Sequence, residues 1–397
     1  MKRLVVFALF VALVAPATLF AQTSTFEEYE TDHFRVLSEI GAEHAEETAN
    51  KLEALLYLFN DYFHFDLDEL PVRLRARFFS TQDSYDTYLQ RVIEQTRDDF
   101  VYLHYTDLAK SELVGYATDA ESFDISLKHQ GFIQFLRAFV PNPPLWMREG
   151  FAVFFEEVEF DDELGIATYR ENLSWLETLQ AVVDGSSSLA PIALDSMLQM
   201  DVATARNNIE VFYPQAWGMI SFLLNSDNRD YNRIIWDSIS ALDPEATLAD
   251  NSTDVYEAAF QWEEEQILVE AFVTYVGERK SFRTLVQDGI DQYSAGNLDE
   301  AERSFVTALK LREDNFIPFY YMGLINYDRK NYSLSDFYYK EALDKGATEA
   351  LTYYALGVNA YADNRFDDAV AYLEETIRLD PSAYENKAQQ LLDRIQG

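Results

Sequence analysis

The sequence contains no cysteine among its 397 residues. It can therefore form no disulfide, carry no lipid on a cysteine and offer no thiolate to a metal or a substrate. Avoidance of cysteine suits an oxidising compartment outside the cytoplasm, where a free thiol is a liability. Long apolar runs are also absent after the first 21 residues, so we expect no integral membrane segment in the mature chain.

Basic residues are scarce as well. Against 69 Asp and Glu there are 31 Lys and Arg, which gives a formal net charge of −38. A surface of this sign repels the phosphates of nucleic acid and anionic lipid headgroups, so we expect neither as a partner. The hydrophobic fraction of 48% is nonetheless sufficient for ordinary cores and excludes general disorder.

The one long apolar run lies at residues 4–15, after two basic residues and before Pro16. It is shorter than the roughly 20 apolar residues that span a membrane. Small residues follow it, and this arrangement predicts a secretory signal peptide over residues 1–21. Cleavage after Ala17 and cleavage after Ala21 fit equally well. We therefore expect a secreted or periplasmic protein of a bacterial cell envelope.

The C-terminal part of the chain repeats with a period of 34 residues. Glycine recurs at this interval at Gly289, Gly323 and Gly357, and four further columns of small, aromatic or apolar residues keep the same register. The period and the columns resemble the tetratricopeptide repeat (TPR), in which each unit is a pair of antiparallel helices. The resemblance implies that residues 279–397 form an all-α solenoid of three repeats with a closing helix.

The preceding residues, 22–278, show a mixed pattern of strands and helices, which predicts an α+β domain. Strands are expected near residues 32–39, 71–79, 100–107 and 111–118, and a helix near 122–139. In the second of these strands, apolar residues alternate with Arg73, Arg75 and Arg77. These arginines could bind an anionic partner, but we expect them to pair with neighbouring carboxylates.

The stretch SLKHQGFIQFLRAFVPNPPLWMREGFAVFFEE, residues 126–157, contains the segment with the clearest chemistry. Its second half carries Pro144, Trp146, Glu149, Gly150 and Ala152 at the spacing of a proline turn and a W-x-x-E-G-x-A helix. This resembles the gluzincin metallopeptidases of the peptidase MA-like group. In that family a preceding helix carries H-E-x-x-H, whose two histidines bind Zn²⁺, and the glutamate of the second helix is the third ligand.

The first half of the stretch departs from the family pattern. His129 stands at the first histidine position, but Gln130 replaces the catalytic glutamate and Ile133 replaces the second histidine. A neutral amide cannot act as a general base, and isoleucine has no lone pair for a metal. The sequence therefore predicts a pseudoenzyme that binds no metal or cofactor. Tyr213 would occupy the position that in some relatives steadies the oxyanion.

Two alternatives are open at this stage. The first is an active zinc peptidase with a nonstandard site formed by His129, Glu149 and either His104 or a carboxylate. The second is an inert first domain, in which His129 is a hydrogen-bonded core histidine and Glu149 pairs with Arg148 or caps its helix.

The most economical interpretation is an exported adaptor protein. A peptidase-like cleft can bind peptides as an added strand at a sheet edge after its catalytic groups are lost. The concave face of the repeats would bind protein or peptide partners, with four tyrosines as groove candidates: Tyr320, Tyr321, Tyr353 and Tyr354. We favour the simpler interpretation that these rings fill the space between helices.

Overall fold

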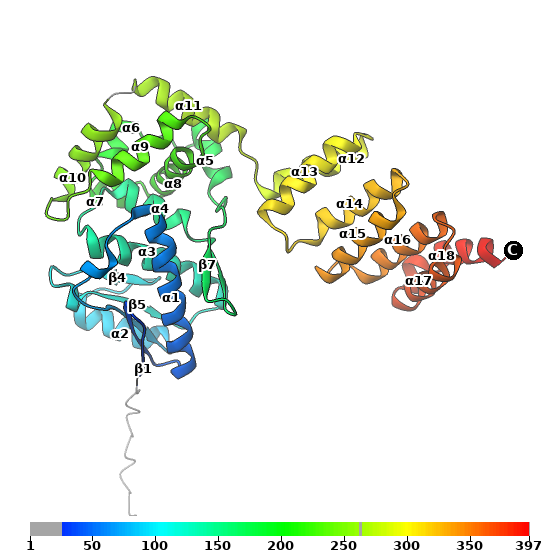
Figure 1. Ribbon diagram of the computed structural model, residues 1–397, viewed down its shortest axis with the longest axis horizontal. Coiled ribbons are helices and arrows are strands. Elements are labelled where there is room, and N and C mark those ends of the chain that lie inside the picture. The colour runs from blue at the N-terminus through cyan, green and yellow to red at the C-terminus, as the bar shows by residue number, and fades with distance from the viewer. Residues whose placement is uncertain (1–25, 262–263, 397) are drawn as a thin grey trace, which may run out of the picture.

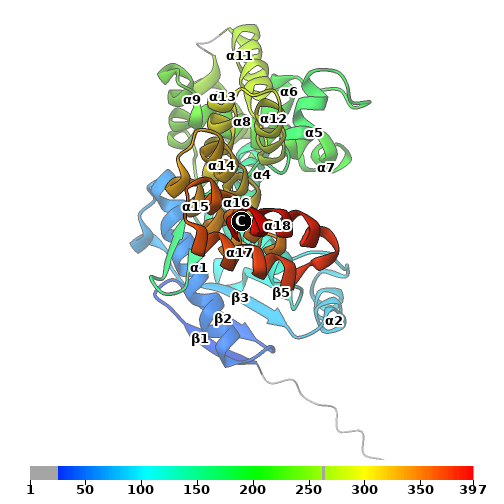
Figure 2. The ribbon, with the colours of Figure 1, turned by 90° about the vertical axis from the view of Figure 1, so that its right-hand side faces the viewer.

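The computed structural model describes residues 26–261 and 264–396, so the predicted signal peptide lies outside the described residues. The chain forms an α+β domain up to α11 (Glu265–Glu278) and a helical array from α12 (Phe282–Ser294) to α18 (Pro381–Gln396). The array extends to one side of the α+β domain (Figures 1 and 2). Within the described chain, no helix is both long enough and apolar enough to span a membrane.

A five-stranded sheet forms the lower half of the first domain in the view of Figure 1. Its spatial order is β1 (Glu27–Glu30), β2 (Phe34–Ser38), β3 (Leu74–Phe79), β5 (Glu112–Tyr116) and β4 (Val101–Leu103). The inner strands β2, β3 and β5 are parallel, and the two edge strands are antiparallel to their neighbours. The four predicted strands are present, although shorter than expected, whereas β1 was not predicted.

One face of the sheet packs on the two long helices α1 (Ala42–Phe63) and α3 (Ala120–Phe139). Leu74, Ala76 and Phe78 of β3 are buried in this core, as the alternation of apolar residues predicts. The predicted strand began three residues earlier, but Val72 is exposed and precedes the first paired residue. The apolar face of β3 thus lies in the main core with α1 and α3.

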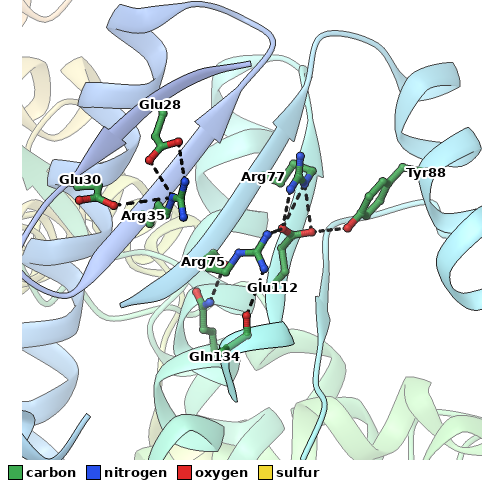
Figure 3. Close-up of polar contacts among 9 residues, drawn as sticks. Glu28, Glu30, Arg35, Arg75, Arg77, Tyr88, Glu112 and Gln134 are labelled. Atoms are coloured by element: carbon green, nitrogen blue, oxygen red, sulfur yellow. Dashed lines mark hydrogen bonds and ion pairs between the residues drawn. The ribbon is translucent and has the colours of Figure 1, made fainter. Parts of the chain in front are cut away.

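The opposite face of β3 carries Arg75 and Arg77, which pair with a carboxylate (Figure 3). Arg75 Nη2 and Arg77 Nη2 both lie 3.0 Å from Glu112 Oε1 on the neighbouring strand β5. Tyr88 donates a hydrogen bond to Glu112 Oε2, and Arg73 lies 3.5 Å from Glu30. The prediction that these arginines pair internally is confirmed.

The remaining elements complete the α+β domain. They are α2 (Gln82–Ile93), α4 (Leu145–Phe154), β6 (Glu159–Asp161), β7 (Ile166–Thr168), α5 (Leu176–Val183), α6 (Leu194–Leu198), α7 (Val202–Asn207), α8 (Ile209–Asn225), α9 (Arg229–Ser240), α10 (Leu248–Val255), the 3₁₀ turns Leu67–Glu69 and Leu108–Lys110, and the π turn Tyr256–Phe260. Helices α4 and α8 pack very closely: a Cβ on Gly150 would lie 2.7 Å from the carbonyl oxygen of Ala216. Glycine at this position therefore lets α4 and α8 approach each other.

The helical array consists of three helix pairs and a last helix that covers the third pair. The pairs are α12 with α13 (Leu298–Leu311), α14 (Phe316–Asp328) with α15 (Tyr332–Asp344), and α16 (Glu349–Ala362) with α17 (Phe366–Leu379). In each pair, the periodic glycine faces a buried side chain of the second helix, namely Phe305, Tyr339 or Leu373. The repeat architecture predicted from the 34-residue period is therefore present.

The array is tied to the α+β domain through polar contacts with its first pair. The guanidinium of Arg170, in the loop after β7, donates two hydrogen bonds of 2.9 and 2.7 Å to the carbonyl oxygen of Leu311 at the end of α13. The amide of Gln180 on α5 donates to the carbonyl oxygens of Val276 in α11 and of Arg279, the residue that follows α11. The Arg170 contact places the first repeat against the first domain, and the Gln180 contacts hold the start of the connection.

Substitution of Gly323 by alanine should lower the free energy of unfolding of the array by about 1–3 kcal/mol, as overpacking typically does. The added Cβ would lie 2.5 Å from the ring of Tyr339, which is buried. Urea unfolding followed by circular dichroism measures the effect. Gly277→Ala is the control, because nothing lies within 4 Å of its Cβ in α11. Equal effects of the two substitutions would contradict this account.

Candidate functional site

Helices α3, α4 and α8 bring the residues of the predicted motif together. His129, Gln130 and Ile133 lie on α3, Glu149 lies on α4, and Tyr213 lies on α8. A cavity of about 440 Å³ is lined by Gln130, Ile133, Glu149 and Tyr213 among others. The i, i+4 spacing places His129 and Ile133 on one face of α3, as the resemblance requires.

Both ring nitrogens of His129 face carboxylates. Nδ1 lies 2.8 Å from Glu156 Oε1, and Nε2 lies 3.6 Å from Glu149 Oε2. Burial alone would lower the pKa of His129, but the two carboxylates outweigh it and raise the pKa to about 9. The imidazole is therefore held as a cation near pH 7, with both nitrogens protonated.

Glu149 is bound from its other side by the neighbouring arginine. Arg148 Nε and Nη2 donate hydrogen bonds of 2.8 and 2.6 Å to Glu149 Oε1. Burial opposes ionisation of this carboxyl, yet the charges of Arg148 and His129 lower its pKa to about 2. The pairing of Glu149 with Arg148, one of the alternatives that the sequence left open, is thus observed.

Glu156 is the member of the cluster that the sequence did not single out. Its second oxygen accepts a hydrogen bond of 3.1 Å from Asn172 Nδ2, and the same nitrogen donates to the carbonyl oxygen of Val153. Glu156 lies just past the end of α4, so helical spacing from Glu149 gave no signal for it. The cluster as a whole contains two cations and two anions and is neutral.

Gln130 contacts the backbone of the sheet through its side-chain amide. Its Oε1 accepts a hydrogen bond of 3.1 Å from the backbone N–H of Tyr102 in the edge strand β4. A peptide added to this edge would need that N–H as a hydrogen-bond donor. The expected binding of a peptide by strand addition is therefore not favoured at β4, which is only three residues long.

His104, the alternative third ligand, is engaged elsewhere. Its Nδ1 lies 2.9 Å from Arg137 Nη2. Burial and the positive charges of Arg137 and Arg148 lower its pKa to about 4, so the ring is neutral and accepts this hydrogen bond. In residues 26–261 and 264–396, no described contact joins His104 to His129 or Glu149.

The residues present do not fit a zinc site. A ligating imidazole must present an unprotonated nitrogen, whereas Nε2 of His129 faces the carboxylate of Glu149 at 3.6 Å, and the nearby carboxylates favour the protonated ring. Glu149 carries a guanidinium on one oxygen, and that cation would repel a metal ion. Among the described residues, no group of three or more His, Asp or Glu side chains is arranged to hold a metal ion.

Tyr213 stacks on this cluster, with its ring centroid 6.2 Å from that of His129. Burial, followed by the negative charge of Glu149, raises the pKa of its hydroxyl, which therefore stays protonated at neutral pH. The role of Tyr213 in steadying an oxyanion stays a prediction that follows from the family resemblance.

The four tyrosines of the repeats are half-buried and pack against rings of neighbouring helices. The ring pairs are Tyr320 with Tyr339, Tyr321 with Phe305, Tyr353 with Tyr372, and Tyr354 with Tyr384, at centroid distances of 5.6, 5.2, 6.1 and 5.3 Å. These contacts agree with the interpretation that the rings fill the space between helices. A role of the four rings in a ligand groove stays a prediction.

Comparison with known proteins matches the chain to solved structures only. No family model and no curated protein matches it. The chain is similar to the first TPR of Spaghetti (RPAP3) bound to the HSP90 peptide SRMEEVD, at 14% identity and a TM-score of 0.27, covering 29% of this chain and 94% of that one. It is also similar to MamA, residue 41 to the end, from Desulfovibrio magneticus RS-1, at 19% identity and a TM-score of 0.26, covering 37% and 90%.

These neighbours agree with a TPR part in the chain, but at such TM-scores they carry no argument of their own. The repeat architecture is therefore based on the helix pairs and their 34-residue spacing. The resemblance of the first domain to gluzincin peptidases stays a prediction.

Proposed function

We propose that this protein is an exported adaptor that binds protein or peptide partners, and that its first domain is a non-catalytic relative of gluzincin peptidases. The main support is the neutral cluster of Arg148, Glu149, His129 and Glu156. Each of the two residues that would bind zinc is held in an ion pair or hydrogen bond with a neighbour. The position of the general base is occupied by Gln130, whose amide binds the backbone of Tyr102.

The repeat array supports the binding part of the proposal. Its helix pairs build an extended surface, and solenoids of this kind use such surfaces to contact other proteins. The strong negative charge of the chain favours partners that present basic segments, because complementary charges accelerate association and like charges oppose it. Export to the cell envelope is based on the signal-peptide pattern of residues 1–21.

Metal content of the purified mature protein tests the non-catalytic part of this proposal. After dialysis against trace zinc, elemental analysis should detect no bound zinc in the natural sequence, since its donors are paired with each other. About one zinc per chain, lost in His129→Gln, would contradict the proposal and favour a zinc peptidase with a nonstandard site.

A restored motif gives the matching positive control. Gln130→Glu, Ile133→His and Arg148→Ala together rebuild H-E-x-x-H and free the carboxylate of Glu149. If the domain is related to the gluzincins, this variant should gain about one zinc per chain. The same variant without Ile133→His should gain none. Failure of the restored variant to bind zinc while it remains folded would count against the family relationship.

A further inference from the structure

The cavity beside the cluster is lined by positive charge in a protein that is otherwise strongly acidic. Four arginines line it, Arg97, Arg137, Arg148 and Arg206, together with one carboxylate, Glu149. In the whole sequence, acidic residues outnumber basic ones by 69 to 31, so a local ratio of four cations to one anion reverses the overall balance. The four arginines come from four separate segments of the chain.

Only one of these arginines has a carboxylate partner. Arg148 is paired with Glu149. Arg137 donates to the carbonyl oxygen of Pro141 and to His104, and Arg97 donates to the carbonyl oxygen of Thr96 and to the side chain of Gln95. In the part of the chain that the structure describes, no carboxylate lies within ion-pair distance of Arg97, Arg137 or Arg206. Three guanidinium charges around the cavity are thus without a counter-ion.

This arrangement differs from that of the arginines on β3. There, Arg75 and Arg77 share the buried carboxylate of Glu112. The protein has many acidic residues with which to neutralise arginine, and it does so on β3 but not around the cavity. Of the three arginines without a carboxylate, Arg137 has the guanidinium most removed from water, and burial of a cation without an anion is energetically unfavourable. A ligand that supplies the anion would therefore be stabilising at Arg137, and Arg97 and the exposed Arg206 would meet it at the mouth of the cavity.

The protonation equilibria agree with a missing anion. Burial, followed by repulsion from Arg148, lowers the pKa of Arg137 to about 10. The pKa of His104 falls for the same reasons, with burial first and the two arginines next. A second cavity of about 410 Å³ lies alongside, shares Arg97 and Arg206 and includes His104. No Asp or Glu of the described residues lines this second cavity, so the positive region continues into it.

We propose that this cavity binds a small organic anion, whose carboxylate or phosphate group is held by Arg97, Arg137 and Arg206. Guanidinium groups match both anions through paired hydrogen bonds. The volume of about 440 Å³ falls in the usual range for small-ligand pockets, roughly 300–1,000 Å³. Phe100, Leu145 and Phe212 provide apolar walls for the remainder of the ligand.

The charged group could belong to a free small molecule or to the C-terminal carboxylate of a peptide. The second source depends on the proposed function, because an adaptor of peptidase-like ancestry would bind peptide ends. Both sources present the same anion to the same arginines. The cavity therefore replaces strand addition at β4 as the place where the first domain recognises a ligand.

Isothermal titration calorimetry at physiological salt tests the proposal with four probes. They are inorganic phosphate, succinate, and the peptide Ala-Ala-Phe with either a free or an amidated C-terminus. We expect at least one of phosphate, succinate and the free-acid peptide to bind with a stoichiometry of about one. The amidated peptide, which lacks the terminal carboxylate, should not bind. Binding of phosphate or succinate alone would identify a free small anion, and tighter binding of the free-acid peptide would identify a peptide end.

Arg137→Gln and Arg206→Gln should each weaken binding on the order of tenfold, the usual loss for one charge-assisted hydrogen bond. Arg206 is exposed and has no polar partner among the described residues, so its removal should not change the melting temperature of the free protein. Arg378→Gln on α17 makes the same change in net charge at a distant exposed position and should leave binding unchanged.

Absence of binding for every probe, or equal binding in all three variants, would overturn the proposal. A zinc-free protein that binds no anion would still be consistent with the proposed function, so the two failures are distinguishable.

Discussion

Substitution of Glu149 by alanine is expected to lower the free energy of unfolding by about 3–5 kcal/mol, the usual cost of breaking a buried ion pair. Glu149 is buried and faces two cations, Arg148 and His129. Its removal leaves the guanidinium of Arg148 without a carboxylate. It also leaves His129 facing one carboxylate instead of two. Guanidinium chloride unfolding at pH 7 measures the loss.

A double-substitution cycle with Arg148→Ala separates the ion pair from other effects of truncation. If the two side chains are coupled as the hydrogen bonds indicate, the cycle should give an interaction energy of about 1–3 kcal/mol. Glu375→Ala provides a matched control, because Glu375 pairs with Arg378 on an exposed face of α17 and its loss should have no measurable effect. An additive cycle would show that the cluster is not a network.

Substitution of Glu112 by alanine should have a similarly large effect of about 3–5 kcal/mol, in this case on the sheet. Glu112 is 2% exposed and accepts hydrogen bonds from Arg75, Arg77 and Tyr88 (Figure 3). Its loss would leave two adjacent guanidinium groups on β3 facing each other without an anion between them. The same unfolding experiment reports the change.

Glu30→Ala is the control for Glu112→Ala, because both carboxylates contact an arginine of the same face. Glu30 is 46% exposed and lies 3.5 Å from Arg73, so its removal should change stability by less than about 1 kcal/mol. If the two substitutions had equal effects, burial would not be the factor that makes the Glu112 contacts strong. Glu112→Gln, which keeps an acceptor without the charge, should fall between the two.

The two groups of arginines show where inference from sequence reached its limit. The alternation in β3 placed Arg73, Arg75 and Arg77 on one face, and the acidity of the chain made internal pairing the better expectation. Nothing in the sequence distinguishes Arg97, Arg137 and Arg206 from these. Only the three-dimensional structure shows that no carboxylate of the described residues lies within ion-pair distance of them. The cavity that they line is formed by segments more than 100 residues apart.

The sequence predicted which residues of the motif lie together, but not the side-chain contacts that they make. The i, i+4 spacing and the second-helix signature placed His129, Ile133 and Glu149 together, and α3 and α4 do so. The hydrogen bond from Tyr102 to Gln130 and the contact of His129 with Glu156 depend on how β4 and the residues after α4 pack. Side-chain contacts between segments cannot be derived from the periodicity of either segment alone.

The sequence by itself determined the parts of this protein that depend on local spacing. The 34-residue period specified paired helices, because glycine at Gly289, Gly323 and Gly357 is needed wherever one helix lies directly against a ring or a leucine of the next. The residue types of Gln130 and Ile133 are likewise given by the sequence, and neither side chain can act as a general base or as a strong metal ligand. Only the tertiary structure decided which charges are neutralised and which are left open, because ion pairing and burial depend on the distances between segments remote in sequence.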